Sequence, residues 1–250
     1  WSGKNAQGAI IGEKYNSFGR VGIYIPGGTA PLVSTALMTI TLAGVAGCRE
    51  ICVCTPPGAD GTVNNDLLHA CQMAGASEVY KVGGAQAIAA MAYGTRRISR
   101  VQKIFGPGNA YVVAAKRLLF GQVAIDLLPG PSELLVIADD SGKPKSIAAD
   151  LLAQAEHGSG HERCWLVTPS GKLLRAVERE IQKQLPTLSR NRFIKAALKR
   201  NGLLIQVQNL KDAVDLANAL APEHCEVMAR GAQKLANGIL TAGALFVGPW

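Results

Sequence analysis

Short, strongly apolar runs alternate along the chain with longer segments in which apolar residues recur every three or four positions. The short runs predict β-strands, and the longer segments predict amphipathic helices. In the first half, this pattern predicts strands at residues 21–25, 50–55, 78–82 and 101–105, and helices at 34–46, 65–73, 85–93 and 110–120. Asn64 or Asn65 fits the N-cap of the second of these helices, because an asparagine side chain can accept a hydrogen bond from the first helical turn.

The alternation resumes after a turn-rich stretch at residues 128–131. It predicts strands at 134–138, 164–168, 203–207, 225–228 and 244–247, and helices at 144–156, 173–185, 192–199, 211–220 and 232–237. Alternation with short connections favours parallel sheets joined by right-handed crossovers. We therefore expect an α/β protein with two doubly wound, Rossmann-like parallel-sheet units and a ligand cleft between them.

The turn-rich stretch also sets the expected domain organisation. Residues 24–131 are predicted to form a nucleotide-binding unit, and residues 132–250 a second unit of the same kind. Residues 1–23 are expected to be an N-terminal segment that joins the second unit. With 250 residues, the chain is long enough to bury a sizeable core.

The charged and aromatic residues of the chain indicate which classes of binding partner to expect. The net charge is +8, but the basic residues are spread along the chain, with the densest stretch at residues 172–200. Their spacing favours the solvent face of amphipathic helices over an anion-binding or nucleic-acid-binding patch. Because no basic stretch is interleaved with aromatic residues that could stack on bases, we expect no nucleic-acid partner.

Cysteine use and hydropathy indicate the compartment. The six cysteines form no CxxC pair, and Cys52 and Cys54 lie two apart in an apolar run. They are expected to be buried, reduced thiols, which is typical of the cytoplasm. No apolar run reaches the length that a membrane span needs, so we expect no membrane partner.

Three glycine-rich turns stand where a predicted strand gives way to a helix, at residues 26–28, 83–86 and 106–111. Glycine lets backbone amides approach a ligand, and the helix start beyond it offers N–H groups to a phosphate. Gly106 and Gly108 begin a dinucleotide fingerprint, but Tyr111 occupies the position of its third glycine. The pattern supports a phosphate-bearing ligand and simple tight turns about equally.

Two polar pairs are candidates for chemistry. Gln154 and His157 lie three apart at the end of a predicted helix, so both can reach one metal ion, although a zinc site needs further ligands. His161 follows on a glycine-broken segment and is favoured as a loop residue. Glu223 and His224 lie between a helix and a strand, where they are either proton-transfer groups or an ordinary solvated carboxylate and a surface histidine.

Together these stretches resemble the histidinol dehydrogenase family. The resemblance runs from about residue 21 to residue 250 and includes VGIYIPGGTAPLVSTALM, KVGGAQAIAA, KIFGPGNAYV, AIDLLPGPSELLVIAD, DLLAQAEHG and APEH. Residues 124–157 match the signature of the family. The length and order of these matches make a chance resemblance implausible.

The resemblance implies a reaction and a set of residues. The family oxidises L-histidinol through L-histidinaldehyde to L-histidine, in histidine biosynthesis, with two NAD molecules reduced in sequence. By resemblance, Glu223 activates the water that hydrates the aldehyde, and His224 contacts the substrate and handles the alcohol proton. Tyr24, Gln86 and Asn109 match positions that contact the NAD cofactor.

The resemblance also implies a zinc ion that anchors the substrate. Gln154 and His157 match two of its ligands and contact the substrate, and Ser132 matches a substrate-contacting serine. The family's other zinc ligand and its partner-reaching residues lie beyond the position of Trp250, so zinc affinity is expected to fall in this chain alone. A homodimer is expected. The alternatives are a related primary-alcohol dehydrogenase of the same family, and an inactive truncated paralogue or fragment that retains only nucleotide binding.

Overall fold

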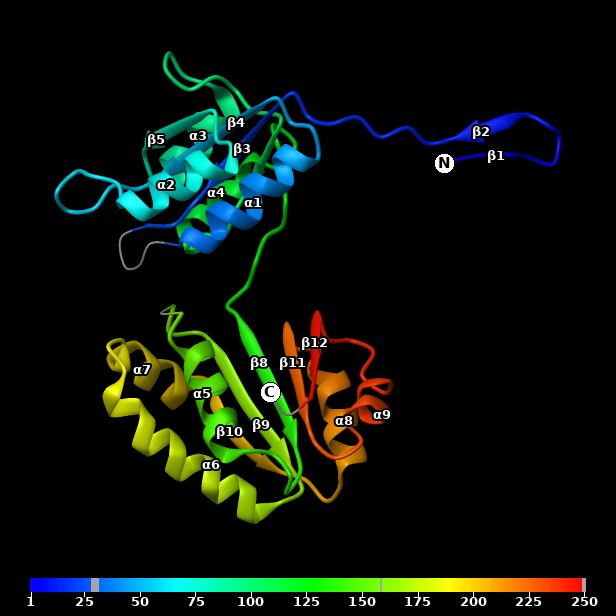
Figure 1. Cartoon of the computed structure of the whole chain (residues 1–250), viewed down its shortest axis with the longest axis vertical. Coiled ribbons are helices and arrows are strands. Elements are labelled where there is room, and N and C mark those ends of the chain that lie inside the picture. Colours follow the sequence, from blue (N-terminus) through cyan, green and yellow to red (C-terminus); the bar gives the residue numbers. More distant parts are fainter. Residues whose placement is uncertain (28–31, 158, 249–250) are drawn as a thin grey trace. The chain divides into compact units, whose positions relative to one another are not determined.

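The computed structural model describes residues 1–27, 32–157 and 159–248 of the chain. It forms two compact units, Trp1–Pro129 and Gly130–Trp250, and each is a parallel sheet with helices on both faces (Figure 1). The predicted turn residue Gly28, the loop residue Gly158, and residues 29–31 and 249–250 lie outside the described residues. The α/β prediction with two parallel-sheet units is confirmed, and the predicted cleft stays a prediction.

The first unit is built on a five-stranded parallel sheet with the order β5-β4-β3-β6-β7. Its strands are β3 (Arg20–Tyr24), β4 (Glu50–Thr55), β5 (Glu78–Lys81), β6 (Lys103–Phe105) and β7 (Ala124–Ile125). Its helices are α1 (Val33–Val45), α2 (Asn65–Ala74), α3 (Gly84–Tyr93) and α4 (Ala110–Leu119). Helices α1 and α2 pack on one face of the sheet, and α3 and α4 on the other.

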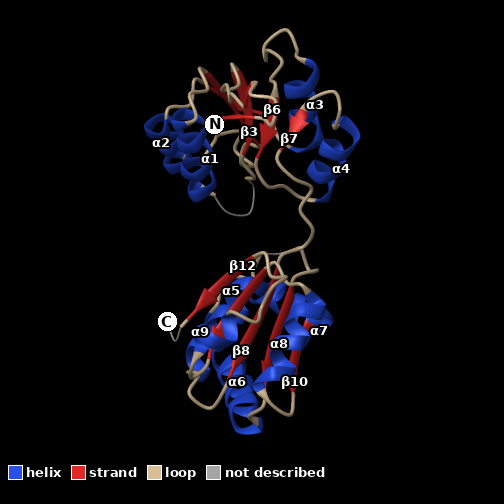
Figure 2. Cartoon of the chain, turned by 90° about the vertical axis from the view of Figure 1, so that its right-hand side faces the viewer, coloured by secondary structure: helices blue, strands red, loops and turns tan. Residues whose placement is uncertain are grey.

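The second unit repeats this topology, with the strand order β10-β9-β8-β11-β12. Its strands are β8 (Glu133–Ala138), β9 (Arg163–Thr168), β10 (Gly202–Gln206), β11 (His224–Met228) and β12 (Ala244–Val247). Its helices are α5 (Pro144–Ala155), α6 (Gly171–Gln184), the 3-10 turn η1 (Leu185–Thr187), α7 (Asn191–Asn201), α8 (Leu210–Leu220) and α9 (Ala232–Ala236). Helices α5, α6 and α7 cover one face, and α8 and α9 cover the other (Figure 2).

The N-terminal segment differs in part from expectation. Strands β1 (Ser2–Lys4) and β2 (Ile10–Gly12) pair antiparallel in a small hairpin of their own, which the apolar pattern did not predict. Residues 20–23 were predicted to join the second unit. That prediction is wrong for them, because the five residues of β3 are all buried and form the centre of the first sheet. The association of residues 1–19 stays a prediction.

Local signals in the sequence explain where several elements begin and end. Asn64 caps α2 as predicted, because its side chain accepts a hydrogen bond from the backbone N–H of Leu67 at 3.1 Å. The same helix ends at Gly75, whose φ of 94° is the left-handed conformation that glycine adopts readily. Burying side chains such as Ile23 and Ile51 contributes about 1.5–3 kcal/mol each.

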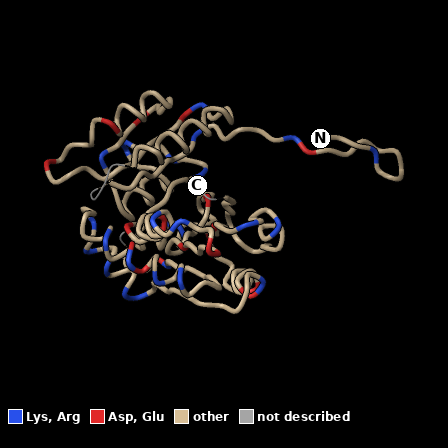
Figure 3. The backbone as a smooth tube through the Cα atoms, turned by 60° about the horizontal axis from the view of Figure 1, so that its bottom comes forward, with Lys and Arg blue, Asp and Glu red and all other residues tan. Residues whose placement is uncertain are grey.

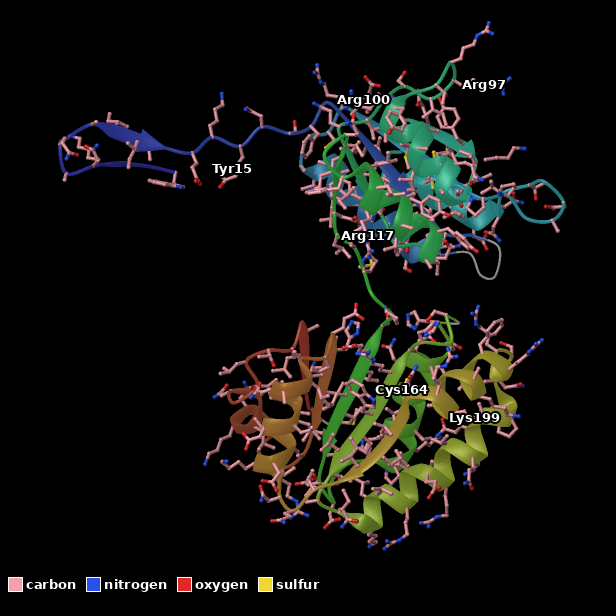
Figure 4. All side chains as sticks on the ribbon, turned by 180° about the vertical axis from the view of Figure 1, so that it is seen from behind. Tyr15, Arg97, Arg100, Arg117, Cys164 and Lys199 are labelled. Atoms are coloured by element: carbon pink, nitrogen blue, oxygen red, sulfur yellow. The ribbon has the colours of Figure 1, made fainter. Side chains whose placement is uncertain are left out.

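The basic residues of α6 and α7 lie on the solvent side of amphipathic helices, as predicted. The buried residues of these helices are Leu173, Val177, Ile194 and Ala197, whereas Lys199 is exposed and projects from α7 (Figure 4). Figure 3 shows Lys and Arg spread over both units. The six cysteines are free thiols, five of them buried. In the described part of the chain, no helix combines the length and the apolar character that crossing a membrane requires.

The carboxyl ends of β3 and β6 approach each other closely at Gly106. This residue follows β6 with a φ of +115°, and a Cβ atom there would lie 2.0 Å from the backbone oxygen of Tyr24. The two strands are neighbours on either side of the point where the strand order reverses, which is where ligands bind in open α/β sheets. Glycine is therefore required at position 106 by both backbone conformation and space.

We predict that Gly106→Ala destabilises the chain more than Gly121→Ala does. Gly121 also has a positive φ, of +98°, but a Cβ there would meet nothing within 4 Å. Gly121→Ala should therefore cost only the conformational term, about 1–2 kcal/mol, and Gly106→Ala at least about 2 kcal/mol more, because backbone must also move. Urea unfolding of both variants measures this difference. Equal losses would contradict the close approach.

Candidate active site

Most of the candidate chemistry of the second unit lies at the amino edge of its sheet. Strands β8 and β11 are neighbours, and they begin at Glu133 and His224. Ser132 and Glu223 directly precede these strands. Helix α5 connects two parallel strands and so runs back across the sheet, which brings its last turn and Gln154 to the same edge (Figure 1).

The backbone of Glu133 holds both members of the Glu223–His224 pair. Its N–H donates to Oε2 of Glu223 at 3.2 Å, and its carbonyl oxygen lies 3.2 Å from Nδ1 of His224. Because a carbonyl only accepts, Nδ1 must carry the proton in this contact. The lone pair of neutral His224 is therefore on Nε2, the nitrogen that faces away from this contact.

The pair is open enough to exchange protons with a ligand. Oε2 of Glu223 lies 3.7 Å from Nδ1 of His224, and the two side chains are 50% and 35% exposed. The His224 ring also lies beside the ring of Phe246, with centroids 6.1 Å apart. A carboxylate next to an oriented imidazole has the composition of a general acid–base pair.

Arg163 fixes the segment that carries this arrangement. Its guanidinium forms an ion pair with the side chain of Glu133, and its backbone N–H donates to the carbonyl of Ser132 at 3.1 Å. Strand β9 thus holds residues 132 and 133 from one side while β11 contacts them from the other. Ser132 was identified from the sequence, but Glu133 and Arg163 were not. Contacts between strands depend on the register of strand pairing, which the spacing of residues along the sequence does not reveal.

Gln154 and His157 lie together, as predicted. Gln154 is 8% exposed, and the exposed His157 places Nδ1 at 3.0 Å from the carbonyl of Gln154 and 3.4 Å from its side-chain nitrogen. A proton on Nδ1 that is donated to the carbonyl leaves Nε2 free. Metal-binding histidines characteristically have this arrangement, with the other ring nitrogen bonded to a carbonyl.

The donors fit part of a zinc shell. An amide oxygen and an imidazole nitrogen supply two of the four positions that zinc usually fills. Among residues 1–27, 32–157 and 159–248, no group of three or more His, Cys, Asp or Glu side chains lies close enough to hold a metal ion. Gln154 and His157 could therefore supply two donors to a metal ion, and its other ligands would have to come from outside the described residues.

The loop after α5 is held by a buried carboxylate. Glu162 accepts hydrogen bonds from the backbone N–H groups of Ser159 and Gly160, and these bonds lower its pKa against the opposing effect of burial. Arg190 donates to the carbonyl of His157 at 3.4 Å. His161 lies in this loop, as expected from the sequence. Its Nδ1 is 3.4 Å from the guanidinium of Arg200. This positive charge disfavours the binding of a metal cation by His161.

One further carboxyl group lies near the pair. Glu226 is on β11, two residues beyond His224 and so on the same face of the sheet. Burial raises its pKa to about 7, and the nearby Asp150 carboxylate adds to the shift. Within the described residues its Oε2 atom is buried without a hydrogen-bond partner. Glu226 has no recognisable signal in the sequence, because a carboxylate inside an apolar run is not by itself a motif.

In the first unit, the three predicted cofactor residues lie at the carboxyl edge of the sheet. Tyr24 ends β3, and its hydroxyl accepts a hydrogen bond from the N–H of Gly84 at 3.0 Å. Asn109 caps α4, since its side-chain oxygen accepts hydrogen bonds from the backbone N–H groups of Tyr111 and Val112. Gln86 is exposed in the first turn of α3. All three therefore lie around the point where the strand order reverses.

Close packing within the chain requires glycine in these glycine-rich turns. A Cβ at Gly27 would lie 2.9 Å from the backbone oxygen of Pro56, and one at Gly83 would lie 2.5 Å from the Pro56 side chain. Tight turns are thus sufficient to explain these glycines. The edge also suits a dinucleotide, because the N-cap residue Gly83 makes no side-chain hydrogen bond to α3 and, apart from the N–H of Gly84 that bonds to the Tyr24 hydroxyl, helix N–H groups can bind phosphate.

At the carboxyl edge of the second sheet, the carboxylate of Asp139 occupies the backbone N–H donors. Asp139 follows β8 and accepts hydrogen bonds from the backbone N–H groups of Ser141 and Arg230, at 2.9 and 3.0 Å. Burial acts to raise the pKa of Asp139, but the hydrogen bond from the Ser141 hydroxyl and these two backbone bonds lower it overall. Because a carboxylate already occupies the donors there, a phosphate would meet repulsion.

Comparisons with known proteins match the chain to one family. The family model described as histidinol dehydrogenase matches residues 1–250. Histidinol dehydrogenases of Geobacillus kaustophilus and Moorella thermoacetica are 49% and 48% identical, over 99% and 100% of this chain. The chain spans 58% and 59% of the length of these relatives.

Solved structures give the same result. The crystal structure of histidinol dehydrogenase from Elizabethkingia anophelis has a TM-score of 0.90 and 40% identity, over 94% of this chain and 54% of that protein. A propionaldehyde dehydrogenase from Rhodopseudomonas palustris has a TM-score of 0.58 at 14% identity, over 94% of this chain and 67% of that protein. At that identity the likeness shows the fold alone.

We predict that His224 and His157, when neutral, carry their proton on Nδ1. Both histidines have Nδ1 directed at a backbone carbonyl, which can only accept a hydrogen bond. Long-range proton–nitrogen NMR above about pH 8, where histidine is neutral, measures the tautomer, with His224→Gln and His157→Gln providing the assignments. A dominant Nε2–H tautomer for either residue would show that its carbonyl contact is absent in solution.

Proposed function

We propose, from the fact that this chain belongs to the histidinol dehydrogenase family, that it supplies the acid–base pair of a two-step NAD-dependent oxidation of L-histidinol to L-histidine. One observation carries the proposal. The peptide of Glu133 holds a carboxylate and an imidazole side by side, with the imidazole oriented to accept a proton on Nε2. Oxidation of an alcohol requires such a general base, which removes the hydroxyl proton.

His224 acts in the first step. Its Nε2 accepts the proton of the substrate hydroxyl while its Nδ1–H stays bonded to the Glu133 carbonyl. The imidazolium that forms is stabilised by the Glu223 carboxylate, 3.7 Å from Nδ1. When bound, NAD supplies the hydride acceptor for both oxidation steps, and zinc anchors the substrate.

Glu223 acts in the second step. Its carboxylate is half exposed, so water can reach it, and its position is fixed by the Glu133 N–H. It removes a proton from the water that adds to the aldehyde, which gives the hydrate that is oxidised to the acid. Ser132 lies at the start of β8 beside this pair, where a hydroxyl can hydrogen-bond a polar substrate.

The binding residues follow from the same arrangement. Gln154 and His157 are proposed to hold zinc and, through it, the substrate, and the half shell that they provide requires further ligands. Tyr24, Gln86 and Asn109 are proposed to contact NAD at the carboxyl edge of the first sheet. The resemblance supports a homodimer, and the six free thiols support the cytoplasm. The scattered basic residues support the absence of nucleic-acid partners.

The test compares two substrates in the intact gene product. His224→Gln should slow NAD reduction with L-histidinol by about 10²–10⁴-fold, since a general base contributes that much. Glu223→Gln should slow the reaction with L-histidinaldehyde by a similar factor and affect the first step less. Steady-state kinetics with each substrate measures both.

Asp215→Asn is the matched control. It removes an exposed carboxylate of α8 that forms a surface ion pair with Lys211, and its rates should equal those of the unaltered protein. Failure of the unaltered protein to reduce NAD with L-histidinol, while it oxidises another primary alcohol, would contradict the proposed substrate. Equal losses from all three variants would contradict the roles of Glu223 and His224.

A further inference from the structure

We propose that the buried ion pair between Lys116 and Asp126 is a positioning device for the proposed dinucleotide site, which locks the loop that runs from Gly106 to Asn109. The inference rests on the proposed use of NAD. Neither residue belongs to the cofactor-contacting set, and neither was identified from the sequence. Both act through the backbone of Gly106.

The contacts form a closed network around one peptide residue. Lys116, on α4, is 1% exposed. Its Nζ donates to the carbonyl of Gly106 at 2.8 Å and pairs with Oδ1 of Asp126. The other carboxylate oxygen of Asp126 accepts the N–H of Gly106 at 2.8 Å. Both polar groups of Gly106 are therefore bonded to the same ion pair.

The network ties three elements together at one edge of the sheet. Gly106 follows β6, Asp126 follows β7 and Lys116 belongs to α4. Asp126 also accepts the N–H of Leu127. Gly106 is pressed against the backbone oxygen of Tyr24, and the hydroxyl of Tyr24 holds the N–H of Gly84 at the start of α3. A shift of Gly106 thus displaces both Asn109 and the contact between Tyr24 and α3.

Stability alone does not account for a lysine at this place. Taking two charges out of water carries a large desolvation cost, and apolar residues of similar volume are often as stabilising. Elsewhere in the same sheet the ion pairs of Arg20 are partly exposed, with side-chain exposures of 58% for Glu50 and 38% for Glu78. The buried pair instead fixes a backbone conformation with a φ of +115°, at the edge where the proposed cofactor residues gather.

The decisive variant is Lys116→Met combined with Asp126→Asn in the intact gene product. It removes both charges at nearly constant volume, so the protein should still fold, with a moderately lower melting temperature because the Gly106 carbonyl loses its donor. The affinity for NADH, measured by fluorescence titration, should fall about tenfold or more because the loop is no longer preorganised. The KM for L-histidinol should change less than twofold.

Hydrogen–deuterium exchange of the cofactor-free protein supplies a readout that is independent of activity. The peptide that covers residues 103–111 should exchange faster in the double variant. Glu78→Gln is the matched control, because it removes an ion-pair partner at the opposite edge of the same sheet. It should leave both NADH affinity and loop exchange unchanged.

The outcomes separate the two proposals. An unaltered protein that neither binds NADH nor reduces NAD would overturn the proposed function, whatever the loop does. A folded double variant with unchanged NADH affinity or unchanged loop exchange would overturn this inference and leave the proposed function standing. If the double variant does not fold, Asp126→Asn alone is measured in the same way, with weaker NADH binding expected and unchanged binding contradicting the inference.

Discussion

The peptide of Glu133 is where the fold of the second unit and its proposed chemistry meet. Its N–H and its carbonyl bind the two side chains that begin β11, and its own side chain is held by Arg163 of β9. Because β8 is the central strand, with β9 and β11 on either side, any change in the register of these three strands would move the acid–base pair. The geometry of the pair is thus set by backbone pairing in a buried sheet rather than by a flexible loop.

The two units share one topology but present their candidate sites at opposite edges of the sheet. In the first unit the carboxyl edge carries glycine at the reversal point and a helix start whose N-cap residue is also glycine, which suit a phosphate-bearing ligand. In the second unit Asp139 occupies the equivalent donors, and the polar side chains collect at the amino edge instead. A shared fold therefore does not fix where the chemistry lies, and particular residues decide it.

The sequence predicted most of the fold because long, periodic segments carry their own signals. The strand pattern of EICVCT and the Asn64 cap are local features, and both were predicted correctly. Strand β7 has two residues and the hairpin strands have three each, too short for periodicity to show. Resemblance identified Glu223 and His224, but the roles of Glu133, Arg163 and Lys116 depend on contacts between distant segments. Those contacts exist only once the register and the packing are known.

The central claim is that the cofactor binds at the carboxyl edge of the first sheet and the substrate at the amino edge of the second. Hydrogen–deuterium exchange of the intact gene product with each ligand in turn tests this claim most directly. NADH should protect peptides that contain Gly84 and Asn109 at the carboxyl edge of the first sheet. L-histidinol with zinc should protect peptides that contain Glu133 and His224 at the amino edge of the second. Protection by L-histidinol at Asp139–Gly142 instead, with none at Glu133, would contradict the account.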